Sequence, residues 1–157
     1  MPWWDKDEWT SMWNGDNCAM CADSPLPRNE HGDLLVETAS SYIRLSRNQT
    51  RAGYCVVVAK RHAPELHHLT ADERAGFWND VSITGEAIST IFQPLKLAQL
   101  CMGFRMPHFH CHIYPQYEMD DPFGLLNPQD GDVRLESAEW DNRVERIRAE
   151  LEVLRRR

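Results

Sequence analysis

The sequence has no long apolar run and no excess of positive charge. Its 157 residues carry 17 Lys and Arg against 24 Asp and Glu, for a net charge of −7. Because affinity for a nucleic-acid backbone depends on clustered basic residues, this charge argues against a general nucleic-acid binder. No segment approaches the ~20 apolar residues of a membrane-spanning helix, and the start lacks the basic and apolar regions of a secretory signal. We therefore expect a cytoplasmic protein with neither nucleic acid nor membrane as its partner.

The number of cysteines is odd. There are five, at positions 18, 21, 55, 101 and 111. An odd number in a chain without an export signal argues against a disulfide framework and favours reduced thiols or metal ligands. Hydrophobic residues make up 42% and charged residues 26% of the chain, which is typical of globular rather than disordered proteins. The length fits one domain.

The first half of the chain predicts an arm and three strands. Residues 1–16 combine tryptophans with acidic residues and predict an irregular arm, laid over the domain or onto a partner. Two short runs of β-forming residues, 34–37 and 42–45, predict a hairpin. Residues 54–59 are apolar throughout, as expected of a central strand that is buried on both faces.

The second half predicts a helix followed by two strands. Thr70 and Glu73 have the spacing of a capping box, so a helix should begin here. Pro94 should end it. Residues 95–102 and 108–114 read as two further strands joined by a turn, which predicts an antiparallel pair.

The C-terminal part predicts a loop and a last helix. Residues 115–132 are rich in Pro, Gly, Asp and Asn and predict a loop. Ser137 then opens a charged helix with one apolar stripe, formed by Trp140, Val144, Ile147, Leu151 and Leu154. We divide the chain into an arm (1–16), a main domain (17–135) and a C-terminal helix packed on that domain (136–157).

Three histidines alternate with apolar residues in the second of these strands. On a strand, the side chains of His108, His110 and His112 would all lie on one face. This suits phosphoryl chemistry, because a neutral imidazole attacks phosphorus readily and also leaves it again. His110, in the middle, is the natural nucleophile, and a neighbour must hold its other ring nitrogen to fix the attacking tautomer.

Two cysteines form a C-x-x-C pair ahead of the first strand. Alone, Cys18 and Cys21 are compatible with metal binding, redox chemistry or simple burial. A tetrahedral zinc ion would need two more ligands. His62 and His108 are candidates, although spacing alone does not fix their positions.

Residues 108–115 resemble the motif of the histidine-triad family, in which histidines alternate with hydrophobic residues before a proline. The similarity extends over roughly residues 17–123. It includes the N-terminal cysteine pair, the strand at 53–62, the Leu69-Thr70 helix start and a tail at 117–122 similar to that of a bacterial, zinc-containing hydrolase subgroup.

The resemblance implies an α+β fold with a five-stranded antiparallel sheet flanked by helices, commonly as a homodimer. It also implies cleavage of a nucleoside 5′-phosphate through a covalent nucleotidyl-histidine. His110 would be the nucleophile, and His112 would support the phosphate. By analogy with related uridylyltransferases, a structural zinc ion would have four protein ligands: Cys18, Cys21, His62 and His108.

Several residues differ from the family pattern around the phosphate. Tyr54 replaces a usual histidine, and Gln116 replaces a frequent arginine. Phe104 and Arg105 stand where small polar residues usually contact phosphate, and only the arginine offers a donor fork in compensation. We therefore predict substrate contacts from Tyr54, Arg105 and Gln116, in a pocket that is rebuilt relative to the family.

Three functions are compatible with this pattern. The first is a nucleotidyl hydrolase or transferase that uses His110. The second is the same scaffold repurposed for another reaction in a specialised pathway, and the third is a zinc-stabilised binding module. The adjacent acids Asp120 and Asp121 could position a substrate, although acids in a loop are more often exposed.

Overall fold

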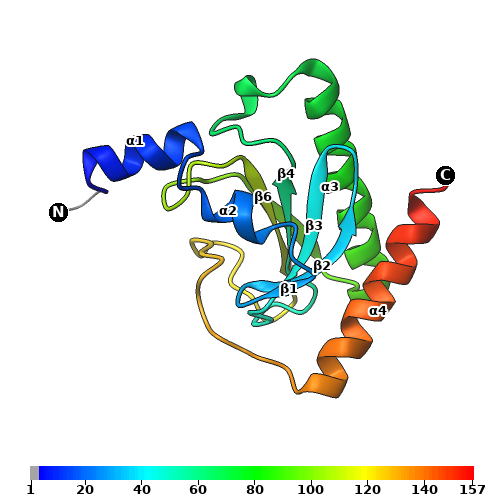
Figure 1. Ribbon diagram of the computed structural model, residues 1–157. Helices are drawn as coiled ribbons and strands as arrows, with labels where there is room; N and C mark the ends of the chain where they lie inside the picture. Colours follow the sequence, from blue (N-terminus) through cyan, green and yellow to red (C-terminus); the bar gives the residue numbers. More distant parts are fainter. Residues whose placement is uncertain (1–3) are drawn as a thin grey trace.

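The strand predicted to be central lies in the middle of the sheet (Figure 1). The computed structural model describes residues 4–157, so Trp3 of the predicted arm lies outside the described residues. Strand β4 (Cys55–Ala59) pairs with β3 (Ser41–Ser46) on one side and β6 (His110–Gln116) on the other. The strand order is β1-β2-β3-β4-β6-β5, and every neighbouring pair is antiparallel. The α+β prediction is confirmed.

The two predicted strand pairs are both present. Strands β2 (Gly32–Glu37) and β3 form the hairpin, and β5 (Lys96–Leu100) pairs with β6. The sheet has six strands instead of the expected five, because β1 (Arg28–Asn29) adds to its edge. A strand of two polar residues is too short to show the alternation of apolar and polar residues by which strands are predicted from sequence. Pairing with Gly32 and Asp33 creates this strand.

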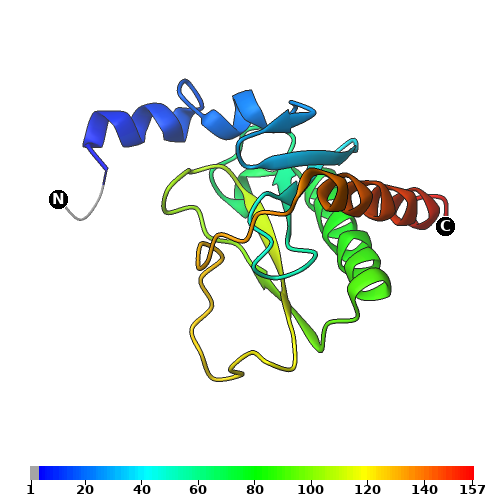
Figure 2. The same ribbon diagram turned by 90° about the horizontal axis from the view of Figure 1, so that it is seen from below.

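Helices α3 (Ala71–Phe92) and α4 (Ser137–Leu154) lie side by side on one face of the sheet (Figures 1 and 2). The predicted capping box starts α3, and Gln93 ends it with a positive φ of 51°. The apolar stripe of α4 is fully buried, as predicted. Cys111 and Ile113 of β6 point into this core. The alternate residues of β6, including His110 and His112, therefore face the other side of the sheet.

The prediction of an irregular arm was wrong. The segment forms helix α1 (Lys6–Asn14), which projects away from the sheet in both views (Figures 1 and 2). The carboxylate of Asp5 caps its start by accepting from two backbone amides, and Gly15 ends it with a φ of 89°. These caps stabilise the two ends of the helix. A short helix, α2 (Ala19–Asp23), follows.

Only two of the three histidines lie within a strand. Strand β6 begins at His110, so His108 lies in the segment before it. The loop after β4 holds this segment, because the amide of Phe109 donates to the carbonyl of Ala63 at 2.6 Å. Nδ1 of His108 lies beside the sulfurs of Cys18 and Cys21.

The start of the loop after β6 is attached to residues 51 and 52. Asp120 forms an ion pair with Arg51 and accepts from the amide of Tyr117 at 2.7 Å. The Tyr117 hydroxyl donates to the carbonyl of Ala52 at 2.6 Å. Asp120 is therefore not simply exposed, whereas Asp121 is. Within residues 4–157, no helix is long and apolar enough to cross a membrane.

Candidate functional site

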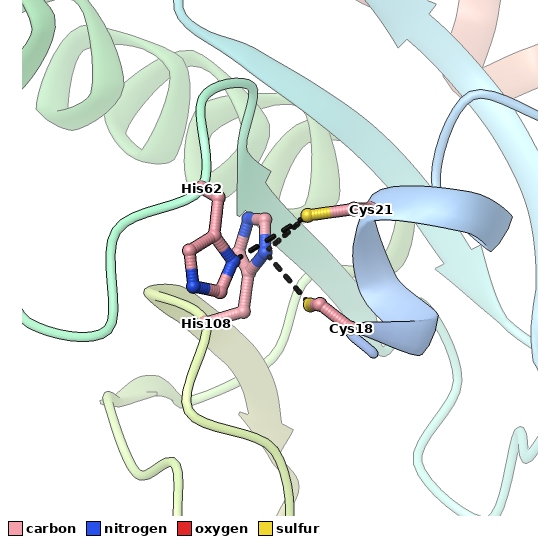
Figure 3. A group of neighbouring side chains, drawn as sticks. All are labelled: Cys18, Cys21, His62 and His108. Atoms are coloured by element: carbon pink, nitrogen blue, oxygen red, sulfur yellow. Dashed lines mark hydrogen bonds between the residues drawn. The ribbon is translucent and has the colours of Figure 1, made fainter. Parts of the chain in front are cut away.

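Four side chains from three parts of the chain converge beside the sheet (Figure 3). Cys18 caps the start of α2 and Cys21 lies within it, three residues later, so both thiols lie on one side of this helix. His62 comes from the loop after β4, and His108 from the segment before β6. One ligand atom from each residue lies within 4.8 Å of the others. This set could hold a metal ion.

Both histidines of the cluster direct the same ring nitrogen towards the sulfurs. Nδ1 of His108 lies 3.4 Å from the sulfurs of Cys18 and Cys21, and Nδ1 of His62 lies 3.4 Å from the sulfur of Cys21. Their Nε2 atoms reach backbone carbonyls, of Ala59 at 2.7 Å and Trp13 at 2.9 Å. Because a carbonyl can only accept, each Nε2 carries the proton and each Nδ1 keeps a free lone pair. Metal-binding histidines are normally arranged in this way.

The charges in the cluster also suit a cation. Burial, together with the neighbouring Cys18, raises the pKa of the Cys21 thiol to about 12. Burial lowers the pKa of His108 to about 4, so its ring is neutral. Two adjacent thiolates would repel each other unless a bound cation neutralised them.

Helix α1 covers the outer side of the cluster. The carbonyl that fixes His62 belongs to Trp13, in the last turn of this helix. A Cβ atom on the next glycine, Gly15, would lie only 2.9 Å from Cδ2 of the His62 ring. Glycine is therefore needed both for its positive φ and for the close approach. This contact could not be predicted from residue types, because Gly15 and His62 are far apart along the chain.

The other two histidines form a connected pair on β6. Nδ1 of His110 lies 2.6 Å from the backbone carbonyl of His108, so it carries a proton and donates it. The Nε2 atom of His110 therefore keeps its lone pair. It lies 3.1 Å from Nε2 of His112, which must be the donor in that contact.

Tyr54 completes this network. Since Nε2 of His112 is protonated, its Nδ1 is an acceptor, and the Tyr54 hydroxyl donates to it at 2.7 Å. Ser46 provides a further side-chain hydrogen bond to this phenol, and burial raises the pKa of Tyr54. Tyrosine thus occupies the place of the usual family histidine and fixes the tautomer of His112.

Burial keeps both histidines of the pair neutral. His110 is 5% exposed, and burial lowers its pKa. Burial, with a smaller effect of His110, lowers the pKa of His112 to about 3. Near neutral pH, Nε2 of His110 therefore has the electron pair that a nucleophile requires.

Two predicted substrate contacts lie apart from this pair. Arg105 is exposed, and its guanidinium donates to Gln129 at 2.9 Å. Gln116 lies six residues beyond His110 at the other end of β6, about 20 Å along the strand. Of the three predicted contacts, the structure brings only Tyr54 to the histidines.

Sequence reasoning also missed the backbone groups that set the tautomers, the carbonyls of Trp13, Ala59 and His108. Carbonyl positions depend on the folded path of the chain, so residue types alone carry no signal for them.

The chain is similar to known proteins in sequence and in fold. The HIT domain family matches residues 28–119. The "Protein hit" of Bacillus subtilis (strain 168) is 28% identical over 87 residues, which cover 52% of this chain and 60% of that protein. The match thus spans about three fifths of the length of that relative.

Solved structures share the fold. A histidine triad protein from Bradyrhizobium japonicum has a TM-score of 0.69 at 18% identity, over 78% of this chain and 92% of that one. A hypothetical histidine triad nucleotide-binding protein from Sulfolobus tokodaii has a TM-score of 0.68 at 22% identity, over 88% and 95%. With the family match over residues 28–119, these findings show that the chain belongs to the HIT family, whose members are generally nucleotide hydrolases or transferases.

Proposed function

We propose that this protein cleaves a nucleoside 5′-phosphate from its leaving group through a covalent nucleotidyl-histidine on His110. The observation that supports this most strongly is the tautomer of His110. Its Nδ1 proton is held by the His108 carbonyl, and its Nε2 lone pair is directed towards His112.

The first step uses the lone pair on Nε2 of His110. This nitrogen attacks the phosphorus, an N–P bond forms, and the bond from phosphorus to the leaving group breaks. The leaving group departs with the bonding pair and takes a proton from solvent. The ring becomes positively charged, and the His108 carbonyl, already 2.6 Å from Nδ1, stabilises that charge.

His112 changes partner during this step. In the free protein its Nε2 proton is donated to His110. An incoming phosphate takes the place of that acceptor, so the same proton is donated to a phosphoryl oxygen. Tyr54 holds the opposite nitrogen throughout and keeps the ring in the donor tautomer. In the second step, water attacks phosphorus and the N–P bond breaks, which releases the nucleoside monophosphate and restores His110.

We further propose that Cys18, Cys21, His62 and His108 bind a structural zinc ion. Sulfur and nitrogen ligands of tetrahedral zinc lie about 3.5 Å apart, and the sulfur–nitrogen contacts here measure 3.4 Å. All four positions are protein ligands, so the ion would stabilise the fold and leave no site for a reacting water. The homodimer implied by the family resemblance and the division into arm, domain and C-terminal helix also remain proposals.

The test is release of nucleoside monophosphate from a panel of phosphoramidates, dinucleoside polyphosphates and nucleotide sugars. We expect His110→Ala to lower turnover by about 10⁴-fold or more, while metal content and melting temperature stay near wild-type values. His31→Ala, at an exposed position, is the matched control. Wild-type turnover in His110→Ala, or no release by the folded, metal-bound wild type, would sink the proposal. The second result would favour the repurposed scaffold, because Phe104 and Arg105 replace the usual phosphate contacts.

A further inference from the structure

Two of the remaining cysteines face each other across strands β5 and β6. The register pairs Leu100 with His112, so the next residues along, Cys101 and Cys111, are directly opposite. Each thiol is near enough to the other to shift its pKa. They lie on the core side of the sheet, away from His110 and His112, because side chains alternate along a strand.

The backbone geometry of this pair suits a disulfide. The amide of Ala59 donates to the carbonyl of Phe109 at 3.0 Å, so the polar backbone groups of Phe109 point towards β4. Since this direction alternates, those of Cys111 also point towards β4 and not towards Cys101. Opposite residues that exchange no backbone hydrogen bonds have Cα atoms about 4.5 Å apart. Disulfides span Cα distances of about 4.4–6.8 Å.

The two thiols differ in access and acidity. Cys101 directly follows β5 and is exposed, whereas Cys111 is fully buried. The neighbouring Cys111 thiol lowers the pKa of Cys101, and the Cys101 thiol together with burial raises the pKa of Cys111. Cys101 is therefore the more reactive thiol, with a second thiol beside it to complete a disulfide. Cys55, by contrast, is fully buried and has its pKa raised by burial.

We propose that Cys101 and Cys111 are a redox modification site, a dithiol that a hydroperoxide oxidises to a disulfide. In the first step, the Cys101 thiolate attacks one peroxide oxygen and becomes a sulfenic acid, as the O–O bond breaks and hydroxide or alkoxide leaves. The Cys111 sulfur then attacks the Cys101 sulfur, and the sulfenic oxygen leaves as water with the Cys111 proton. Two thiols and one hydroperoxide thus give one disulfide, one water and one alcohol, or a second water from hydrogen peroxide.

The bond would tie the end of β5 to the strand that carries the catalytic pair. The segment that follows Cys101 contains Phe104 and Arg105 and leads directly to His108. A disulfide would restrain the start of this segment. The modification itself does not depend on the proposed nucleotidyl chemistry, since its readout is a covalent bond and not turnover.

The experiment treats the full, reduced, metal-loaded chain with hydrogen peroxide, blocks free thiols, and digests it with trypsin. Cleavage after Lys96, Arg105 and Arg134 separates the two cysteines into peptides 97–105 and 106–134. We expect the intact mass to fall by about 2 Da, because a disulfide has lost two hydrogens, and the two peptides to be linked. Dithiothreitol should reverse both changes.

Two variants give the controls. Cys101→Ser should abolish the linked peptide, and Cys55→Ala should leave it unchanged. A labelling experiment adds the kinetic test, in which iodoacetamide should modify Cys101 at least ~10-fold faster than Cys55 in the folded chain.

Three results would overturn the proposal. The first is oxidation of Cys101 to a sulfinic acid while Cys111 stays a free thiol. The second is a disulfide that maps only to Cys18 and Cys21. The third is no change of Cys101 or Cys111.

Discussion

Histidines form both the proposed metal cluster and the proposed catalytic pair, His110 and His112, but the two regions use opposite ring nitrogens. His62 and His108 present Nδ1 to the cysteine sulfurs and donate from Nε2 to backbone carbonyls. His110 does the reverse, donating from Nδ1 to a carbonyl and keeping Nε2 free. The position of the nearest carbonyl, and not the residue type, therefore decides which nitrogen is available for metal or for phosphorus.

His108 belongs to both regions. Its ring lies in the metal cluster, while its backbone carbonyl holds the nucleophile. The two regions thus share one residue, so we expect a change in the proposed metal cluster to affect His110 through the His108 carbonyl.

The largest effect is expected from removing the two metal-binding thiols. Cys18→Ser with Cys21→Ser should lower the metal content from about one ion per chain to almost none, because two ligands are lost. Since metal-binding energy is largely folding energy, the melting temperature should fall by about 10 °C. Elemental analysis and thermal unfolding provide the measurements, with Cys101→Ser as the control. A double variant with unchanged metal content would disprove the metal cluster.

The fold was largely predictable from sequence, since its elements have local signals. The apolar run at 54–59, the capping box at Thr70 and the stripe of the last helix each identify one element. The two missed elements were missed for different reasons. Strand β1 exists only through pairing with β2, which leaves no local signal. Helix α1 has local signals in its caps, Asp5 and Gly15, but its tryptophans and acidic residues were interpreted as an irregular arm.

The sequence predicted which residues form the candidate site, but not how they are arranged in space. The motif pointed to His110, and the family resemblance pointed to the four residues that converge in the metal cluster. It did not show that His108 lies before the strand, because that depends on the hydrogen bond from Phe109 to Ala63.

The second prediction concerns stability and pH. The pKa of His112 falls from an ordinary 6.5 to about 3 in the folded protein. The unfolded chain therefore binds more protons at acidic pH, so this contribution to stability is complete above pH 6.5 and is lost as the pH falls towards 3. Between pH 6.5 and 5 the loss should be about 2 kcal/mol. Urea unfolding at both pH values measures it, on the wild type and His112→Gln.

His112→Gln should lose less stability than the wild type between pH 6.5 and 5. His31→Gln, at an exposed histidine, should behave like the wild type. An equal loss in His112→Gln and the wild type would show that His112 is not a buried neutral histidine.

The third prediction tests Tyr54, which donates a hydrogen bond to His112 of the proposed catalytic pair. Tyr54→Phe removes the donor to Nδ1 of His112, so His112 can adopt the wrong tautomer, and kcat should fall by roughly 10–30-fold. Tyr114→Phe removes a hydroxyl from the ring that packs edge-on against Tyr54, and should have little effect. Equal kcat values for Tyr54→Phe and Tyr114→Phe would argue that the hydrogen bond is irrelevant to turnover. The metal content should stay constant in both.

The smallest effect is expected at the contact between α1 and the metal cluster. Gly15→Ala places a methyl group against the His62 ring at a φ of 89°, which should cost about 1 kcal/mol in stability. Metal affinity should weaken a few-fold, as measured by competition with a chelator. Asn14→Ala, one residue earlier and exposed, serves as the control. Unchanged affinity in Gly15→Ala would separate α1 from the cluster.

The most direct test of the central claim is to trap the covalent intermediate on His110. Wild-type protein is mixed with a nucleoside phosphoramidate, quenched in alkali to preserve the N–P bond, and examined by intact mass and peptide mapping. The account predicts a mass gain of one nucleotidyl group on peptide 106–134, located at His110 and absent from His110→Ala. Product release without any adduct in the wild type, or the same adduct in His110→Ala, would contradict it.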